Sequence, residues 1–478
     1  MNNIKRIAKN TFYLTLAETI TKFILFILTI YIARYLKDVG FGKFSFAFAF
    51  SSFFAIVSDF GLNTLATREI AKNKSMVAKY LGNISYLKLL ISITSFILLI
   101  IIINLLKYPS DTKLVVYIVG LHVIITSFNQ FYIAVFRAFE KMEYETFVRI
   151  LEKIFLFFLV IYLIYYDYGL VSIVSAYLIS SVFAVMLSYI MTSKIVNRQN
   201  TKIDFSFIWD TTKSALPFCL TAIFVTIYFQ IDTIMLSIMQ NDSAVGYYNA
   251  AYRIIFGLML IPTAFVSSIF PLMSKYCEQS EKKGYCEVYT KGFKYLLLIS
   301  LPITILGITF ADKLIIFIYG PEYTQSINSF KVLLLVIPII FLTSLFGPAL
   351  QAANRQHIVT YVTASNATLN IILNYILIPH YSYIGAAVAT VITEGLGFTL
   401  MYYFISRDSI KLSLFENIVK PLVASFVIIL VIYYFKQIEW ILASIIGLTF
   451  YVLAIYFMKI ITRDELRILR FVLGSKTP

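Results

Sequence analysis

Residues 80–106 of this chain read YLGNISYLKLLISITSFILLIIIINLL, a mostly apolar run that contains a single charge, Lys88. About 20 apolar residues in a helix cross the ~30 Å hydrocarbon core of a bilayer, so this run is long enough to span a membrane. Polar and apolar residues do not alternate in it, as they do in the roughly ten-residue strands of a membrane β-barrel. The run therefore predicts a transmembrane helix, and we expect Lys88 to extend toward an interface.

Similar runs recur along the whole chain, and the composition agrees with them. Of 478 residues, 60% are hydrophobic and 14% are charged, whereas soluble domains are about 25% charged. We therefore predict an all-α polytopic membrane protein with about fourteen transmembrane helices. The expected spans are residues 11–33, 44–66, 80–106, 114–136, 146–166, 169–192, 214–239, 246–272, 293–319, 327–350, 357–379, 384–405, 418–435 and 440–458.

Lys and Arg are distributed unequally between the two sets of loops. If the N-terminus and every second loop share one side, that side carries about 29 of the 40 Lys and Arg residues. The positive-inside rule assigns such a side to the cytoplasm, so both termini are expected there. We predict a multi-pass protein of the cell membrane. The net charge of +15 follows from this placement and does not indicate a nucleic-acid partner.

The sequence contains little that catalysis would need. Its three Cys and three His residues form no recognisable metal-site pattern, and it has no Gly-Lys-Ser/Thr phosphate loop. The loops assigned to the outer side are short, so no extramembrane catalytic domain is expected. A transporter without a metal or cofactor is favoured over an enzyme. A membrane polysaccharide polymerase, which typically carries long outer loops, is the less favoured alternative.

Two short segments six spans apart indicate an internal repeat. Residues Lys37–Ala47 read KDVGFGKFSFA, and residues Asn241–Ala251 read NDSAVGYYNAA. Aligned on Gly42 and Gly246, both segments continue with an aromatic residue two positions later and an alanine five positions later. A six-plus-six parallel repeat with two additional C-terminal spans is the simplest interpretation. Transporters commonly place the substrate path between such repeats.

Five ionisable residues lie well inside expected spans: Glu18, Lys22, Asp59, Asp232 and Arg253. A charge at the centre of a span costs roughly 2.5–3.5 kcal/mol even on the insertion scale, so these residues are candidate functional groups. Glu18 and Lys22 are four residues apart in the favourable order for an ion pair, and a self-neutralised pair is an equal alternative for them. Asp59 alternatively caps a predicted helix break, and Arg253 alternatively extends to the outer interface.

Four motifs carry a resemblance to a known family. They are Ser58-Asp-Phe-Gly-Leu-Asn63, Ala66-Thr-Arg-Glu69, Gln230-Ile-Asp-Thr-Ile-Met-Leu236 and Gly246-Tyr-Tyr-Asn-Ala-Ala-Tyr-Arg253. Together with the span layout, they make the chain resemble the polysaccharide flippases (Wzx-type O-antigen and oligosaccharide exporters) of the multidrug/oligosaccharidyl-lipid/polysaccharide superfamily. The resemblance covers essentially the whole chain.

The resemblance implies a V-shaped pair of six-helix lobes around a central cavity. These lobes are expected at residues 1–200 and 201–410, with two additional helices and a basic cytoplasmic tail at 411–478. The implied cargo is an oligosaccharide on a polyprenyl phosphate or pyrophosphate. It would move from the cytoplasmic to the outer leaflet by alternating access, for surface polysaccharide or glycan synthesis. Membrane lipids and polysaccharide-assembly enzymes are the other implied partners, with H⁺, Na⁺ or the membrane potential as the driving force.

In that fold the first, second, seventh and eighth spans line the cavity, and the five candidate charges lie on these spans. We predict Arg253 and Lys22 as ligands of the cargo phosphates, because guanidinium offers a planar fork and ammonium a point charge. Asp232, Asp59 and Glu18 are predicted as further cavity groups.

Three other charges are predicted as gate or ion-coupling residues: Arg34, Arg68 and Glu394. Ordinary loop charges, or a pair of Arg68 with Glu69, are the alternatives. Lipid II flippases of the same superfamily carry arginines on the first, second and eighth spans, whereas the second span here carries Asp59. This departure favours a glycolipid other than the peptidoglycan precursor. The main alternative function is an ion-coupled multidrug efflux antiporter of the same superfamily.

Overall fold

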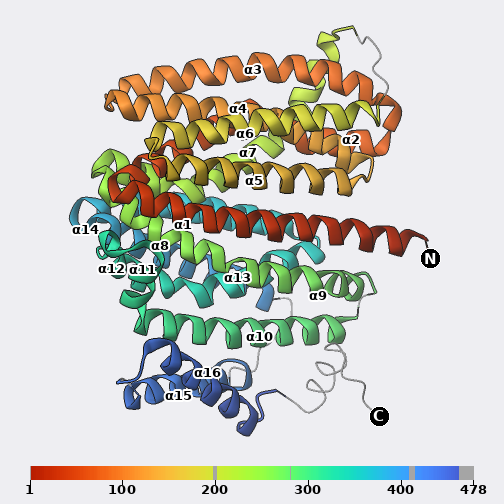
Figure 1. The fold of residues 1–478 in the computed structure, drawn as a ribbon. Helices are drawn as coiled ribbons and strands as arrows, with labels where there is room; N and C mark the ends of the chain where they lie inside the picture. Colours follow the sequence, from red (N-terminus) through yellow and green to blue (C-terminus); the bar gives the residue numbers. More distant parts are fainter. Residues whose placement is uncertain (1, 197–201, 280, 408–414, 436, 462–478) are drawn as a thin grey trace. The chain divides into compact units, whose positions relative to one another are not determined.

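Every regular element in the described part of the chain is helical, which confirms the all-α prediction. The structure is a computed structural model that describes residues 2–196, 202–279, 281–407, 415–435 and 437–461 (Figure 1). The basic tail predicted at the C-terminus lies outside these residues from position 462 onward. The predicted boundary before the last two helices, at residues 410 and 411, also lies outside them.

The elements follow in the order labelled in Figure 1. The first are α1 (Asn2–Asp59), α2 (Leu62–Lys72), the 3₁₀ turn η1 (Lys74–Met76), α3 (Val77–Leu105), α4 (Ser110–Ala138), α5 (Met142–Tyr165) and α6 (Gly169–Ser193). The next are α7 (Phe205–Met239), α8 (Asp242–Leu258), α9 (Leu260–Glu278), α10 (Lys282–Thr309), α11 (Ala311–Tyr319) and the 3₁₀ turn η2 (Pro321–Tyr323). The last are α12 (Ser326–Leu334), α13 (Val336–Ala352), α14 (Gln356–Ser406), the π-helical turn η3 (Phe415–Val419), α15 (Lys420–Tyr434) and α16 (Trp440–Phe457).

Ten helical stretches of the described residues are long and apolar enough to cross a membrane, or up to eleven if the pair α12–α13, bent by 44°, counts as one span. The stretch Lys9–Lys72 has 64 residues and α14 has 51, whereas one crossing needs about 20. Left-handed residues, Lys37 (φ 55°) and Ser382 (φ 51°), divide them. Each therefore has the length for two crossings, and with α5 the helices correspond to the fourteen expected spans.

Helix α5 carries five charged residues: Glu143, Glu145, Arg149, Glu152 and Lys153. Its carboxylates are paired, because Glu145 lies 3.1 Å from Arg149 and Glu152 lies 2.6 Å from Lys153. Pairing offsets part of the cost of placing charges in an apolar environment. The charges of α5 are therefore compatible with a helix inside the membrane region of the fold.

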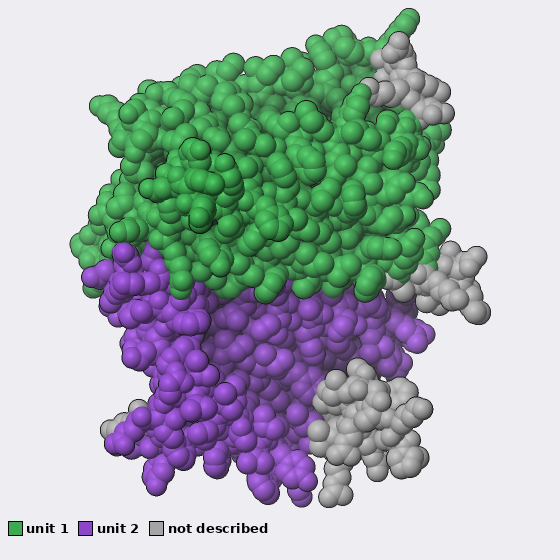
Figure 2. Space-filling model, in the orientation of Figure 1, with its two compact units in different colours: residues 1–253, 367–386 green, residues 254–366, 387–478 purple. Residues whose placement is uncertain are grey.

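The structure divides into two compact units, coloured in Figure 2. The first unit comprises residues 1–253 and 367–386, and the second comprises residues 254–366 and 387–478. The lobe boundaries expected at residues 200 and 410 remain a prediction.

Each unit has its own apolar core. In the first unit α4, α5 and α6 meet at Ile133, Phe136, Val148 and Ala184, all almost fully buried. In the second unit α10, α15 and α16 meet at a cluster that contains Leu298, Ala424, Ile428, Ile432 and Tyr451. These contacts bury the apolar side chains that lie between helices, whereas many apolar side chains on the outer surfaces of the helices remain exposed and can contact lipid.

The helix break predicted after Asp59 is present. Helix α1 ends at that residue, and Phe60 (φ 49°) and Gly61 (φ 76°) adopt left-handed backbone before α2 begins. A Cβ on Gly61 would lie 2.8 Å from the Ala215 carbonyl oxygen of α7. Glycine therefore serves both the turn and the close approach of α7.

Helix α7 begins at a well-defined cap. The Asp204 carboxylate accepts a hydrogen bond of 3.0 Å from the Phe207 backbone N–H, and lies 2.7 Å from the Lys79 ammonium. The hydrogen bond from Lys79, followed by that from Phe207, lowers the pKa of Asp204. The cap is therefore ionised at neutral pH and joins the start of α7 to the start of α3.

Candidate functional site

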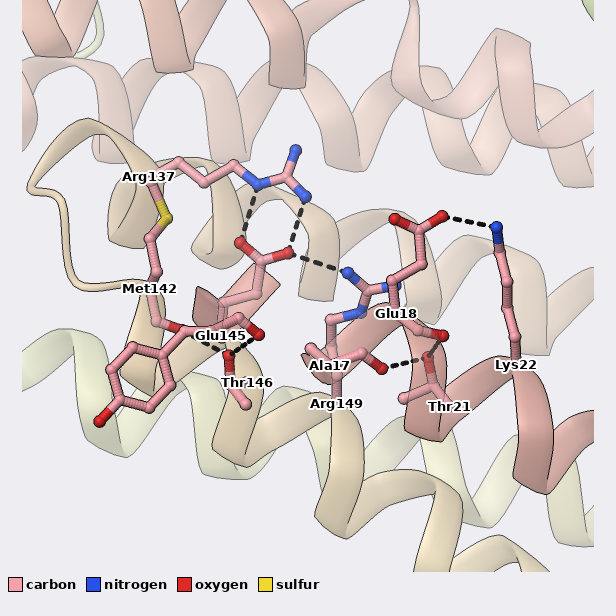
Figure 3. Close-up of polar contacts among 10 residues, drawn as sticks. Ala17, Glu18, Thr21, Lys22, Arg137, Met142, Glu145, Thr146 and Arg149 are labelled. Carbon is pink, nitrogen blue, oxygen red and sulfur yellow. Dashed lines mark hydrogen bonds and ion pairs between the residues drawn. The ribbon is translucent and has the colours of Figure 1, made fainter. Parts of the chain in front are cut away.

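The two candidate charges of α1 belong to a larger group in the first unit (Figure 3). Glu18 and Lys22 form the predicted ion pair, with a distance of 2.5 Å. Next to them lie Arg137 at the end of α4 and Glu145 and Arg149 near the start of α5. We call these five residues the Glu145 cluster.

Glu145 is the centre of this cluster. Its carboxylate accepts two hydrogen bonds from the Arg137 guanidinium, at 2.8 and 2.7 Å, and a third from Arg149 at 3.1 Å. The Glu145 side chain is fully buried, whereas those of Arg137 and Arg149 are 43% and 29% exposed. Glu18 is also close enough to Arg137 to interact with its charge. Bidentate guanidinium–carboxylate pairs of this kind are strong and fix the geometry of both groups.

The Glu145 cluster carries an excess of positive charge. Three cations, Lys22, Arg137 and Arg149, face two carboxylates, Glu18 and Glu145, which leaves one net positive charge. The sequence prediction missed Arg137, Glu145 and Arg149 because it assigned the first two to a cytoplasmic loop. The four-residue spacing of Glu145 and Arg149 was the available signal.

Asp59 has a partner that the sequence prediction did not assign. The Lys88 ammonium of α3 donates hydrogen bonds to the Asp59 carboxylate at 2.8 Å and to the Asn63 side chain at 3.2 Å. The Lys88 side chain is fully buried, so the expectation that it extends toward an interface was wrong. An internal carboxylate makes burial less costly than a long path to water. Asp59 therefore binds a buried lysine rather than capping the helix break.

Asp232 lies in a buried polar group formed by three helices of the first unit. Its carboxylate accepts a hydrogen bond from the Tyr248 hydroxyl of α8 at 2.6 Å and one from the Asn374 amide of α14 at 2.5 Å. Asn374 also donates to Asn370, one turn earlier, at 2.9 Å. All four residues are less than 6% exposed. The carboxylate is thus held between helices by hydrogen bonds from a hydroxyl and an amide.

Arg253 is placed differently from the two carboxylates. It lies half-buried on α8, and its guanidinium is close enough to the Tyr177 hydroxyl of α6 for the two to interact electrostatically. Within the described ranges, no hydrogen bond or ion pair links Arg253 to another side chain. Its fork of donors is therefore available to a ligand.

The predicted gate and ion-coupling residues lie apart from these groups along the chain. Arg34 is exposed on α1, and Glu394 is half-buried on α14. Arg68 pairs with Glu69 at 3.0 Å, the alternative that the sequence offered, and Glu69 also binds Lys72 at 2.8 Å. The gate and coupling roles of these three residues remain predictions.

The two repeat segments meet each other inside the first unit. A Cβ on Gly42 would lie 2.7 Å from the Asp242 carbonyl carbon, and a Cβ on Gly246 would lie 2.9 Å from the Asp38 carbonyl carbon. Each glycine stands four residues after the aspartate that its counterpart touches, so the contact is reciprocal. The Asp38 carboxylate also accepts a hydrogen bond from the Tyr247 hydroxyl. We call the meeting of residues 38–42 with residues 242–246 the repeat contact, and its symmetry agrees with the predicted internal repeat.

The described residues contain no group of three or more His, Cys, Asp or Glu side chains that could hold a metal ion. The charged residues described above offer electrostatic interactions: Lys22, Arg137, Arg149 and Arg253 can attract anions, and the Asp232 carboxylate can attract a cation or a proton.

Comparisons with known proteins agree with this fold. A family model described as "Polysaccharide biosynthesis protein" matches residues 7–277, and a second, described as MatE, matches residues 217–376. A lipid II flippase structure, MurJ in an inward closed conformation, superposes with a TM-score of 0.74 at 17% identity, covering 95% of this chain and 99% of that one. An inward-facing multidrug resistance transporter of the MATE family gives a TM-score of 0.63 at 14% identity, covering 81% of this chain and 95% of that one.

Two curated relatives are similar in sequence. A putative O-antigen transporter of Shigella flexneri is 25% identical over 406 residues, which cover 81% of this chain and 94% of that protein. A probable low-salt glycan biosynthesis flippase of Haloferax volcanii is 29% identical over 181 residues, or 37% of this chain. That second match spans only 38% of the Haloferax protein.

The apolar helices and the superposed structures define an all-α, multi-pass membrane protein with the fold shared by MurJ and the MATE transporters. The predicted fold class is confirmed. The chain belongs to the polysaccharide biosynthesis protein family, whose model matches more than half of its residues.

Proposed function

We propose that this protein is a flippase that moves an oligosaccharide on a polyprenyl phosphate or pyrophosphate from the cytoplasmic to the outer leaflet. Membership of the family and the similarity to a putative O-antigen transporter support this function. The observation that carries it is the distribution of charge within the first unit. Asp59 is neutralised by Lys88, whereas the Glu145 cluster has one positive charge in excess and Arg253 has an available guanidinium.

A positively charged interior suits this cargo. The phosphate or pyrophosphate must leave bulk water to cross, and burying that charge without compensation is prohibitive. Arg253 would bind phosphate oxygens through two donors, while Lys22 would act as a point charge. Glu18, Asp59 and Asp232 would orient these cations or accept hydroxyl groups of the sugar. The sugar-assembly enzymes of the cytoplasmic face would supply the cargo.

The charge of the loops supports an orientation with both termini in the cytoplasm. The repeat contact follows a first helix that begins at the N-terminus, so it would lie at the outer end of that helix. A closed contact there would block the outer side while cargo enters from the cytoplasm. Its separation would release the cargo outward, which is one step of alternating access between two six-helix lobes.

Arg253→Ala is expected to reduce flipping roughly ten- to a hundredfold, because a charged hydrogen-bonding group contributes about 1.5–3 kcal/mol. The measurement is translocation of a labelled polyprenyl-pyrophosphate oligosaccharide in proteoliposomes. Lys213→Ala serves as the control, since it removes a positive charge from an exposed position of α7. Arg253→Lys should recover part of the rate. Full activity of Arg253→Ala would refute the phosphate-binding role.

A second candidate function is ion-coupled efflux of a multidrug substrate, which the buried carboxylate of Asp232 favours. The same carboxylate would serve H⁺ or Na⁺ coupling in a flippase. Asp232→Asn keeps the shape of the group but removes its charge, so transport should lose its dependence on an imposed H⁺ or Na⁺ gradient. An unchanged gradient dependence would exclude Asp232 as the coupling residue. Export of small cations without glycolipid movement would establish the antiporter instead.

A further inference from the structure

A lysine lies directly beside the repeat contact, at the side that the proposed orientation places outside. Lys43 follows Gly42 on α1, and its ammonium forms an ion pair with the Asp111 carboxylate in the first turn of α4. The Lys43 side chain is 17% exposed. The ammonium is therefore held at the repeat contact rather than extended into water.

A second carboxylate approaches the same lysine from α8. Asp242 is the first residue of that helix, and its backbone carbonyl is the group that a Cβ on Gly42 would meet. Asp242 is half-buried and interacts electrostatically with both Lys43 and Asp111. Partial burial removes hydration from a carboxylate, and a nearby ammonium offsets part of that cost. Lys43 thus attracts α8 across the repeat contact while it stays paired with α4.

An aromatic residue brings the ends of four helices together around these charges. The Tyr108 hydroxyl, just before α4, shares a hydrogen bond of 2.8 Å with the Ser237 hydroxyl near the end of α7. The Tyr108 ring stacks on Phe46 of α1, with 4.6 Å between ring centres. Tyr108 also interacts electrostatically with Asp242. The parts of α1 and α4 around Lys43 therefore meet the end of α7 and the start of α8.

The charges of this group act against each other without the lysine. Asp111 and Asp242 repel each other, whereas each is attracted to the Lys43 ammonium. Removing the ammonium would leave the repulsion and take away the attraction. Such a change favours separation of α8 from α1 and α4, which is the movement that opens the repeat contact.

Lys43 also lies further along the proposed cargo path than Arg253. Asp242 and Arg253 are eleven positions apart on α8, which corresponds to roughly 16 Å along the helix axis. A phosphate that leaves Arg253 toward the outer side would approach Lys43 at the repeat contact. Phosphate oxygens accept charge-assisted hydrogen bonds as carboxylate oxygens do, so a phosphate can replace a carboxylate beside an ammonium.

We propose that Lys43 is a charge latch, which holds the outer side closed by attracting Asp242 and is released when the cargo phosphate takes the place of that carboxylate. The inference rests on the flippase function proposed above, and it names the group that couples arrival of the cargo to opening. Asp111 keeps the ammonium in place during the exchange, because it belongs to α4 and does not move with α8.

A distance measurement between spin labels at Val39 and Ile238 tests the latch. Both residues are exposed and lie close in the chain to the two halves of the repeat contact, and the three native cysteines are replaced first. In proteoliposomes without cargo, Lys43→Gln and Asp242→Asn should each raise the population with the longer distance roughly two- to fivefold, the effect of losing one partly exposed ion pair.

Charge reversal distinguishes a latch from a general loss of structure. Lys43→Glu alone should lengthen the distance, because it places three carboxylates together. Combining Lys43→Glu with Asp242→Lys restores one cation between two carboxylates and should return the short distance. Lys43→Arg should also keep the distance short. A misfolded variant would not be rescued by a second charge change.

Two further variants serve as matched controls. Asp111→Asn should leave the distance short, because it removes the repulsion on Asp242 and leaves Lys43 to that carboxylate. Lys107→Gln removes a positive charge from an exposed position of the loop before α4 and should have no effect. Distances in Lys43→Gln and Asp242→Asn that equal those of the wild type would overturn the latch, as would an equal lengthening in Lys107→Gln.

The release step is tested by adding cargo to the wild type. A polyprenyl-pyrophosphate oligosaccharide should raise the population with the longer distance, whereas the same sugar on a polyprenol without phosphate should not. An equal response to both lipids would overturn release by the phosphate. Failure of the proposed function gives a different result: the wild type would not flip the labelled glycolipid, while Lys43→Gln would still differ from it in distance without cargo.

Discussion

Glu145→Gln is expected to lower the free energy of unfolding by about 3 kcal/mol, because removing one partner of a buried ion pair costs roughly 3–5 kcal/mol. The substitution leaves two guanidinium groups, those of Arg137 and Arg149, without the carboxylate that they share. Their side chains are partly exposed, so water compensates some of the loss and the lower end of the range applies. Thermal unfolding of the purified protein, followed by tryptophan fluorescence, should show a midpoint several degrees lower.

Glu143→Gln is the matched control for this substitution. It removes the same charge from the same helix two residues earlier, where the carboxylate lies 3.9 Å from a largely exposed Lys9. A pair of this kind contributes less than about 1 kcal/mol. Combining Glu145→Gln with Arg137→Gln should cost less than the sum of the two single changes, because the residues share one network. If Glu145→Gln unfolds at the same temperature as Glu143→Gln, the cluster does not stabilise the first unit.

The membrane fold could be predicted from the sequence, whereas the partners of the buried charges could not. Apolar runs of span length occur at every predicted position, since burial in hydrocarbon requires them. Spacing along a helix identifies residues on one face, which is how the pair of Glu18 and Lys22 was predicted. It does not identify which other helix meets that face. Asp232 receives a hydrogen bond from Asn374, 142 positions away.

The burial of Lys88 and Glu145 also could not be predicted from the sequence. Both were assigned to polar surroundings, because an isolated charge near the end of an apolar run usually reaches water. Each is instead fully buried against a partner from another helix, Asp59 of α1 for Lys88 and Arg137 of α4 for Glu145. Only the packing of α1 with α3, or of α4 with α5, makes burial less costly than exposure. The internal repeat, in contrast, was visible as a sequence pattern because both copies need glycine at the same position.

Because the repeat contact requires glycine at positions 42 and 246, replacing either glycine should have a large effect on transport. Gly42→Ala or Gly246→Ala is expected to separate the repeat contact and to reduce flipping at least about fivefold. The added Cβ would lie 2.7 Å from the Asp242 carbonyl carbon or 2.9 Å from the Asp38 carbonyl carbon, and backbone atoms cannot move aside as a side chain can. Overpacking typically costs about 1–3 kcal/mol, which would shift the population from closed to open by roughly five- to more than a hundredfold.

Val39 and Ile238 are both exposed and lie next to the two halves of the repeat contact in the chain. After replacement of the three native cysteines, spin labels at these two positions would allow the distance between them to be measured in proteoliposomes. The expected result is a longer distance in both glycine variants together with slower glycolipid flipping. Gly347→Ala and Gly395→Ala are the matched controls, because a Cβ at either position meets no other atom within 4 Å. Alanine there should preserve transport and stabilise its helix by roughly 0.5–1 kcal/mol. If Gly42→Ala transports cargo as fast as Gly395→Ala with an unchanged distance, the repeat contact is a fixed structural element and the outer gate lies elsewhere.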